Sequence, residues 1–265
     1  MKMIFLLTIG VFFTNISVAQ NSTIKVEYDE IVSFIPQIVN NDKGVLYVSQ
    51  NESYYNTTFD NTKSIEKIDN ESIVVPALDT EYFSEIYIDK KAKTLSENLF
   101  ERIVIKKYYS VTEQVPNMKW KLINEKKKIN NLLCKKAQIT FRGRTYVAWY
   151  TEEIPISSGP WKFNGLPGLI LSIDDSEEIY KWRVKSITYP FKGNFDLSQV
   201  KKRMKKFNKI SFKDFDTKVI NAQKNKFETL KTRNGGRNQS VELEFSTSQW
   251  KEPINEFRIQ KDFSF

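Results

Sequence analysis

The sequence predicts a mainly β protein of the α+β class: a strongly curved antiparallel sheet or open barrel, with late helices packed on one side. Three observations lead to this fold. Short stretches rich in β-branched and aromatic residues follow one another from residue 23 to residue 185, with polar links between them. One stretch alternates strictly, placing Tyr180, Trp182 and Val184 between charged residues. Helical periodicity begins only after residue 196. A β-sandwich is the alternative.

The first half of the chain contains single strand patterns and hairpin patterns. A charged run at residues 125–128 is predicted to link the last two strands, and residues 60–70 are predicted to form a polar loop. The predicted strands cover residues 23–27, 44–49, 54–59, 82–88, 99–105, 108–114, 119–124 and 134–141.

A strand, a proline-containing loop and a second strand make up residues 141–175. Residues 145–151 suit a central strand, because both of its faces carry apolar side chains. Proline lacks the amide proton that a sheet needs, so Pro155 predicts the end of this strand near residue 154. Pro167 and Gly168 occupy the positions that they favour in a type II turn, which predicts a positive φ at Gly168. Residues 169–173 then form a short apolar strand.

This stretch also carries a family resemblance. Residues 165–170 read Gly-Leu-Pro-Gly-Leu-Ile, and the chain resembles the GLPGLI family, exported proteins of a Gram-negative lineage named after that hexapeptide. The family has no established catalytic function. The resemblance implies one domain over residues 20–265 with a family-specific core at about 118–175, in which the motif residues have a structural role. The matching positions are Cys134, Ala137, Phe141, Gly143, Arg144, Tyr146, Ala148, Trp149, Tyr150, Thr151, Ile154, Pro155, Gly159, Pro160, Gly165, Leu166, Pro167, Gly168, Leu169 and Ile170.

The amino terminus has the pattern of a secretory signal peptide over residues 1–19. A lysine precedes an apolar run that is too short to span a bilayer, and small residues follow at Ser17 and Ala19. Residue 20 is glutamine rather than the cysteine of a lipoprotein. We therefore expect an exported protein, periplasmic or associated with the outer membrane, that carries no lipid anchor.

The residue types present exclude several kinds of catalysis. The chain has no histidine and one cysteine, Cys134, so it has no Ser-His-Asp or Cys-His machinery and no zinc site of the usual ligands. We expect no metal and no cofactor, and a binding protein rather than an enzyme. The alternative is a carboxylate-dependent periplasmic hydrolase that uses Glu152 or Glu153 beside the proline-containing loop.

Two groups of residues are candidates for binding. Trp149, Trp161 and Phe163 suit the wall of a ligand pocket, although a plain core is the more frequent use of such side chains. The whole net charge of +9 lies in residues 201–233, which contain twelve basic and three acidic residues. This stretch belongs to a helical segment at about 196–233, with capping residues at Asp196 and at Ser211 with Asp214. Its lysines expected to face an anionic partner are Lys201, Lys202, Lys205, Lys206 and Lys209.

Together these features predict a non-catalytic binding or accessory protein of the cell envelope. It would act with an outer-membrane or other envelope protein, or hold an apolar ligand in the curve of its sheet. An anionic surface of lipid or lipopolysaccharide is a further expected partner for the lysines. Nucleic acid is not expected, because an exported protein rarely meets it.

The signal peptide leads to a direct prediction. Cleavage after Ala19 gives a mature protein that begins at Gln20. Amino-terminal sequencing of the protein purified from its native envelope checks this, and a chain that still begins with Met1 would contradict export.

Overall fold

The computed structural model describes residues 23–35, 38–58, 83–101, 107–193 and 195–234. The signal peptide, the predicted loop at residues 60–70 and the end of the predicted strand at 99–105 lie outside the described residues. No helix in the described part of the chain has the length and apolar character needed to cross a membrane.

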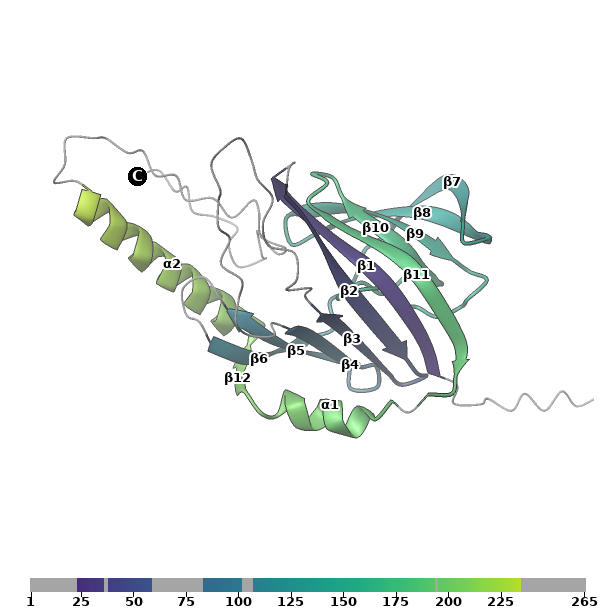
Figure 1. Cartoon of the computed structure of the whole chain (residues 1–265), viewed down its shortest axis with the longest axis horizontal. Helices are drawn as coiled ribbons and strands as arrows, with labels where there is room; N and C mark the ends of the chain where they lie inside the picture. Colours follow the sequence, from purple (N-terminus) through teal and green to yellow (C-terminus); the bar gives the residue numbers. More distant parts are fainter. Residues whose placement is uncertain (1–22, 36–37, 59–82, 102–106, 194, 235–265) are drawn as a thin grey trace, which may run out of the picture.

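Twelve strands in the described residues form one open, strongly curved sheet, which confirms the predicted fold class (Figure 1). The sheet is antiparallel except where β12 runs parallel to β6. The strands are β1 (Thr23–Ile35), β2 (Ile38–Val48), β3 (Glu52–Thr58), β4 (Phe83–Asp89), β5 (Thr94–Glu101), β6 (Lys107–Gln114), β7 (Lys121–Ile129), β8 (Leu132–Phe141), β9 (Arg144–Thr151), β10 (Leu169–Asp175), β11 (Tyr180–Phe191) and β12 (Asn208–Ser211).

The strand order divides the sheet into two limbs. It runs β12-β6-β5-β4-β3-β2-β1 and continues β11-β10-β9-β8-β7, so apart from β12 each limb is a run of neighbours in sequence. We call the β1–β6 side with β12 the first limb and the β7–β11 side the second limb. The limbs meet where β1 pairs with β11 along most of their length. Strands that follow one another in sequence pair antiparallel within each limb, and among the described strands the β1–β11 and β6–β12 pairings join strands distant in sequence.

The turn between β7 and β8 differs from the prediction. Residues 125–128 do not link two strands; they lie inside β7, and Asn130 and Asn131 make the turn with φ of 48° and 65°. A two-residue hairpin turn needs positive φ at both positions, which asparagine tolerates better than lysine. The lysines instead lie on an exposed edge strand, which a bulge between Ile123 and Lys126 interrupts.

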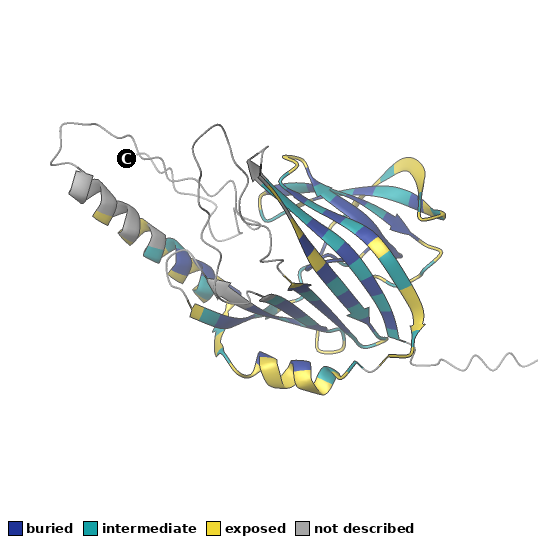
Figure 2. Cartoon of the chain, viewed as in Figure 1, coloured by how far each residue is buried: buried dark blue, intermediate teal, exposed yellow. Residues whose placement is uncertain are grey.

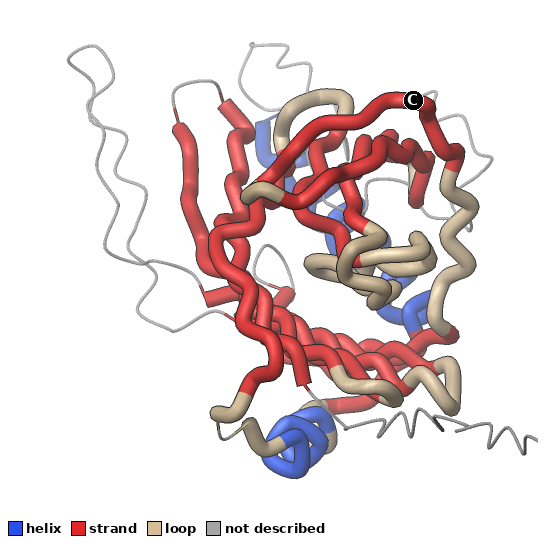
Figure 3. The backbone as a smooth tube through the Cα atoms, turned by 90° about the vertical axis from the view of Figure 1, so that its right-hand side faces the viewer, coloured by secondary structure: helices blue, strands red, loops and turns tan. Residues whose placement is uncertain are grey.

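A loop fills the concave side of the sheet. Residues 152–168, which we call the plug loop, connect β9 to β10 and lie inside the curve (Figure 3). Its Trp161, Phe163 and Leu166 are buried in the main core with residues of both limbs. The Trp161 ring stacks with that of Trp182, their centroids 6.2 Å apart, and the Phe163 ring meets that of Tyr146 edge to face at 4.8 Å. The plug loop is therefore part of the main core. Along the strands, buried residues alternate with less buried ones (Figure 2).

The two described helices lie on different faces, whereas the sequence predicted both on one side. Helix α1 (Leu197–Met204) packs Val200 and Met204 against Tyr54 on the convex face. Helix α2 (Phe212–Asn234) begins beside Val111 of β6. Val111 is paired with Glu97 of β5, and the side chains of a directly paired couple lie on the same face of a sheet, which here is the concave face. The short strand β12 lies between the two helices in sequence and at the edge of the sheet, so the chain crosses from the convex face to the concave face there.

The predicted helix caps are confirmed. The side chain of Asp196 accepts a hydrogen bond from the backbone N–H of Ser198 at 2.8 Å, at the start of α1. The hydroxyl of Ser211 accepts from the N–H of Asp214 at 3.0 Å and donates to its carboxylate at 2.6 Å. These bonds satisfy amide groups that the first turn of a helix leaves without a partner.

Gly168 does not have the positive φ of a type II turn, so that prediction is wrong. Among the described glycines, Gly143 and Gly165 have positive φ, at 84° and 88°. Gly168 is required for a different reason: a Cβ there would lie 2.0 Å from the carbonyl oxygen of Thr151. The end of β9 and the start of β10 therefore approach each other where a side chain has no room.

We predict that Gly168→Ala destabilises the protein by about 1–3 kcal/mol, the usual cost of forcing extra atoms into a packed site. Because the cause is contact rather than φ, Gly168→Asn should lose at least as much. Gly165→Asn is the matched control and should lose less, since asparagine tolerates positive φ and a Cβ at Gly165 meets nothing closer than 3.4 Å. Urea unfolding measures all three variants, and equal stability of Gly168→Ala and the parent would reject this account.

Candidate functional site

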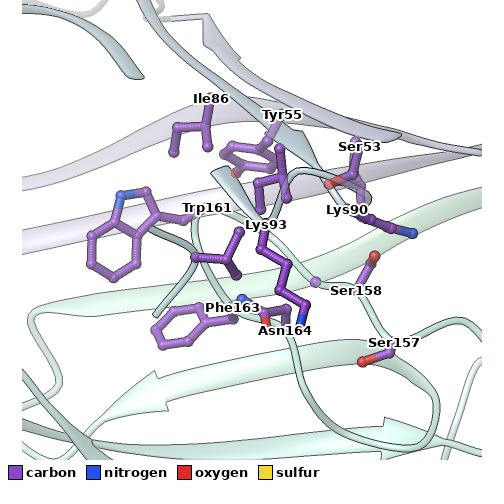
Figure 4. A pocket seen from close by; sticks show the side chains of 14 residues that line it. Ser53, Tyr55, Ile86, Lys90, Lys93, Ser157, Ser158, Trp161, Phe163 and Asn164 are labelled. Atoms are coloured by element: carbon purple, nitrogen blue, oxygen red, sulfur yellow. The ribbon is translucent and has the colours of Figure 1, made fainter. Parts of the chain in front are cut away.

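A cavity of about 240 Å³ lies between the plug loop and strands β2–β4 with the turn that follows β4 (Figure 4). Strands supply one wall and the plug loop supplies the facing wall, so the two walls come from parts of the chain about a hundred residues apart. Its lining residues are Leu46, Ser53, Tyr55, Ile86, Ile88, Lys90, Lys93, Val115, Ser157, Ser158, Gly159, Trp161, Phe163 and Asn164.

One side of the cavity is apolar and aromatic. Trp161, Phe163, Ile86 and the ring of Tyr55 gather there in Figure 4. The hydroxyl of Tyr55 donates a hydrogen bond to the carboxylate of Glu30 at 3.0 Å. Burial first, and then the charge of Glu30, hold the pKa of Tyr55 well above its usual value. Tyr55 therefore stays protonated and contributes an apolar ring face to the cavity.

The other side of the cavity is polar. Ser53 and Ser158 lie beside Lys90 there (Figure 4). The ammonium of Lys90 donates to the carbonyl oxygen of Ser49 at 3.1 Å, and burial lowers the pKa of Lys90. Lys93 also lines the cavity from the same turn. The sequence did not predict this polar side, because the stretch from Asp89 to the predicted strand at 99–105 was expected to be only a polar link.

The turn that carries these lysines is well defined. The carboxylate of Asp89 accepts hydrogen bonds from the N–H groups of Lys91 and Ala92, each at 2.9 Å. The carbonyl oxygen of Lys93 accepts from the N–H of Val115 at 2.9 Å. An acidic residue just before a lysine-rich turn was the available signal, because aspartate often bonds the backbone of the turn that follows it.

A buried ion cluster anchors the plug loop to the first limb. The side chain of Lys162 is 0% exposed, and its ammonium lies 2.8 Å from a carboxylate oxygen of Glu97 and 3.4 Å from one of Glu113. Arg142, from the turn between β8 and β9, forms an ion pair with Glu113 as well. The Arg142 guanidinium also lies 3.6 Å from the ring centre of Phe212, the first residue of α2. This cluster joins the plug loop, both limbs and α2.

A second buried ion pair lies at the far end of β10. The Arg144 guanidinium lies 2.5 Å from the carboxylate of Asp175, and both side chains are almost fully buried. Asp175 also accepts a hydrogen bond from the N–H of Tyr180 at 2.7 Å. Asp175 therefore holds the start of β11 in place.

The three aromatic residues that were predicted to form the wall of a ligand pocket do not all lie at the cavity. Trp161 and Phe163 line the cavity, but Trp149 does not. Trp149 lies on the opposite face of β9 from the buried Tyr146, Ala148 and Tyr150. There the ammonium of Lys127 lies 4.1 Å from the centre of its ring. Alternation along a strand places neighbours on opposite faces, so Trp149 cannot share a site with the plug loop.

The five lysines that were predicted to face an anionic partner are exposed, but one of them also contacts the sheet. Lys201 forms an ion pair with Glu52 of β3 and helps to hold α1 against the sheet. Arg203 does the same, with its Nε 2.8 Å from the carboxylate of Glu85. The lysines that face solvent without this docking role are Lys202, Lys205, Lys206 and Lys209.

Glu152 and Glu153 do not form a catalytic pair at the cavity. Glu152 is exposed and pairs with Lys135 at 2.6 Å, and Glu153 accepts a hydrogen bond from the N–H of Leu133 at 2.7 Å. Neither lines the cavity. In the described residues, no three histidine, cysteine or acidic side chains gather in a way that suits a metal ion.

Comparison with known proteins finds a short family match. Residues 140–172 match a family described as "Protein of unknown function (Porph_ging)". This stretch contains β9, the plug loop and the beginning of β10, including residues 165–170. No curated protein matches the chain.

Two solved structures are similar to part of this chain. They are titled "Structure of PNGF-II in C2 space group" and "Structure of PNGF-II in P21 space group", with 18% and 17% sequence identity and a TM-score of 0.48 each. The matches cover 72% and 74% of this chain but 31% and 32% of those chains. This chain therefore matches less than one third of the length of either.

The buried ion cluster predicts a large effect for Lys162→Met. The substitution keeps most of the volume but leaves Glu97 buried without its cation, which should cost about 3–5 kcal/mol of unfolding free energy. Adding Glu97→Gln should recover part of the loss, because it removes the stranded charge. Urea unfolding measures both variants.

The matched control is Lys135→Met, which removes a lysine whose ion pair with Glu152 lies on the surface. It should change stability little, since exposed pairs contribute little. Similar losses for Lys162→Met and Lys135→Met would show that the cluster does not anchor the plug loop.

Proposed function

We propose that this chain is an exported, non-catalytic binding or accessory protein of the cell envelope that holds a small apolar ligand in the curve of its sheet. The observation that carries the proposal is the composition of the cavity. Half of its fourteen lining residues are apolar or aromatic, and none of the fourteen carries a carboxylate. An enzyme that works through acids and bases would bring such groups together in its cleft. The lining suits a binding site better.

The volume of the cavity favours a small ligand. At about 240 Å³ it is below the ~300–1,000 Å³ of typical ligand pockets. Burial of apolar surface supplies roughly 25 cal/mol per Å², so contact with Trp161 and Phe163 would be the main source of affinity for a ligand of this size.

The amino-terminal pattern supports export. A basic residue, a short apolar run and a small-residue cleavage site are the features of a secretory signal. The resemblance to exported proteins with the GLPGLI hexapeptide supports the same placement. Gln20 at the expected new terminus supports a protein without a lipid anchor, in the periplasm or at the outer membrane.

Association with an anionic surface or an acidic envelope protein is a second candidate function. Lys202, Lys205, Lys206 and Lys209 are exposed on and just after α1, which is docked firmly by its apolar side. Each lysine near an anionic membrane contributes on the order of 1 kcal/mol, and salt screens this attraction beyond ~8 Å. Co-sedimentation with anionic vesicles tests it. Binding that survives reversal of these four lysines to glutamate would reject it.

The alternative of a carboxylate-dependent hydrolase has little support from the geometry. Its two candidate residues, Glu152 and Glu153, are exposed and bonded to the second limb rather than directed to the cavity.

The proposed site is tested by filling it. Ile88→Trp adds bulk to a side chain that lines the cavity and should weaken binding of octan-1-ol, a neutral apolar probe, at least tenfold. Calorimetry measures the affinity, and circular dichroism checks the fold. Leu122→Trp is the matched control, since Leu122 is 61% exposed and lies on β7, outside the cavity lining. Failure of the parent protein to bind octan-1-ol or any other probe would contradict the proposed function.

A further inference from the structure

We infer that the cavity is specific for an anionic amphiphile: a small molecule with an apolar body and one carboxylate head, the head lying beside Lys90, Ser53 and Ser158. This inference rests on the proposed function and deepens it by assigning the charge of the ligand. It follows from how the lining divides, from the surroundings of Lys90 and from the two serine hydroxyls.

The cavity has a polar side and an apolar side. Figure 4 shows Ser53, Lys90 and Ser158 on one side, and Trp161, Phe163 and Ile86 on the other. A wholly apolar ligand would leave the polar groups without partners, which is unfavourable for buried groups. A wholly polar ligand would gain nothing from the aromatic side. An amphiphile satisfies both.

Lys90 has no counter-charge among the described residues. Its ammonium makes one hydrogen bond, to the carbonyl oxygen of Ser49, and no described carboxylate lies within ion-pair distance. Lys162, the other lysine removed from solvent in this region, instead has Glu97 and Glu113 beside it. A partly buried ammonium is stabilised by an opposite charge, and a bound carboxylate would supply the charge that Lys90 lacks.

Ser53 and Ser158 provide hydrogen-bond donors for the same head group. They are 6% and 4% exposed, and neither hydroxyl bonds to another described side chain or backbone group. Both residues line the cavity. Ser157 differs, because its hydroxyl already accepts a hydrogen bond from the N–H of Gly165 at 2.9 Å. Two free hydroxyls beside an ammonium form a set of donors that matches the two oxygens of a carboxylate.

The charged residues that line the cavity are all basic. Lys93 lines it, Lys91 lies in the same turn, and none of its lining residues is acidic. Asp89 precedes the turn, but its carboxylate is occupied by the N–H groups of Lys91 and Ala92. A cavity with apolar walls and cationic groups on one side attracts anions and repels cations.

Calorimetry with three probes of the same chain length tests the inference on the mature full-length protein at pH 7. Octanoate is ionised at that pH, octan-1-ol is neutral and octylamine is cationic. We expect octanoate to bind at least tenfold more tightly than octan-1-ol, and octylamine most weakly. Lys90→Met should abolish the preference for octanoate while changing octan-1-ol affinity less than about threefold. The matched control, Lys91→Met, alters the same turn outside the cavity lining and should keep the preference.

The outcomes separate this inference from the proposed function. Equal affinity of the parent protein for octanoate and octan-1-ol would overturn the anionic head group and leave an apolar site. Preferential binding of octylamine would overturn it too. A preference for octanoate that persists in Lys90→Met and in the double variant Ser53→Ala/Ser158→Ala would overturn the assigned residues. Should Lys90→Met fail to fold, the probe preference of the parent and the serine variant still decide the question.

Discussion

The structure depends on a buried lysine with two carboxylates. Lys162 comes from a loop, yet it is as buried as any core residue, because Glu97 and Glu113 meet it inside the curve of the sheet. Taking such charges out of water is favourable only when their partners are held in place. Arg142 forms an ion pair with Glu113, so the cluster contains two positive and two negative charges. No pair among the described strands closes the sheet, so beyond the β1–β11 pairing the two limbs are joined by electrostatics and by the aromatic residues of the plug loop.

The cavity is a consequence of this arrangement. The side chains next to Lys162 in sequence, Trp161 and Phe163, form part of the cavity wall, so the ion cluster sets how far the plug loop lies from β3 and β4. Removal of the plug loop would leave a wide apolar trough. With the plug loop in place, the trough narrows to a space for a small molecule, and the polar turn after β4 borders one side of it.

Local patterns in the sequence predicted strands, caps and the helical segment, because those depend on neighbouring residues. The strict alternation of Tyr180 with Trp182 and the box at Ser211 needed no tertiary information. Three features could not be found in this way. Gly168 is constrained by contact with Thr151, the partner strands of Lys162 are more than forty residues away, and Lys90 joins the cavity only because β4 and the plug loop meet. Each depends on contacts between residues that the chain brings together only on folding.

The pairing of β1 with β11 has a consequence for how the protein is made. Thr23 lies beside Phe191, so the first described strand finds its second neighbour only when nearly all of the sheet has been synthesised. Contacts between residues so distant in sequence form slowly, because the loop entropy must be lost before they contribute. Until then β1 has a free edge, and no β1–β11 pairing joins the limb that carries the plug loop to the limb that forms the facing wall of the cavity. A ligand of the kind inferred here can therefore bind only the completed fold, and it would stabilise that fold in proportion to its concentration.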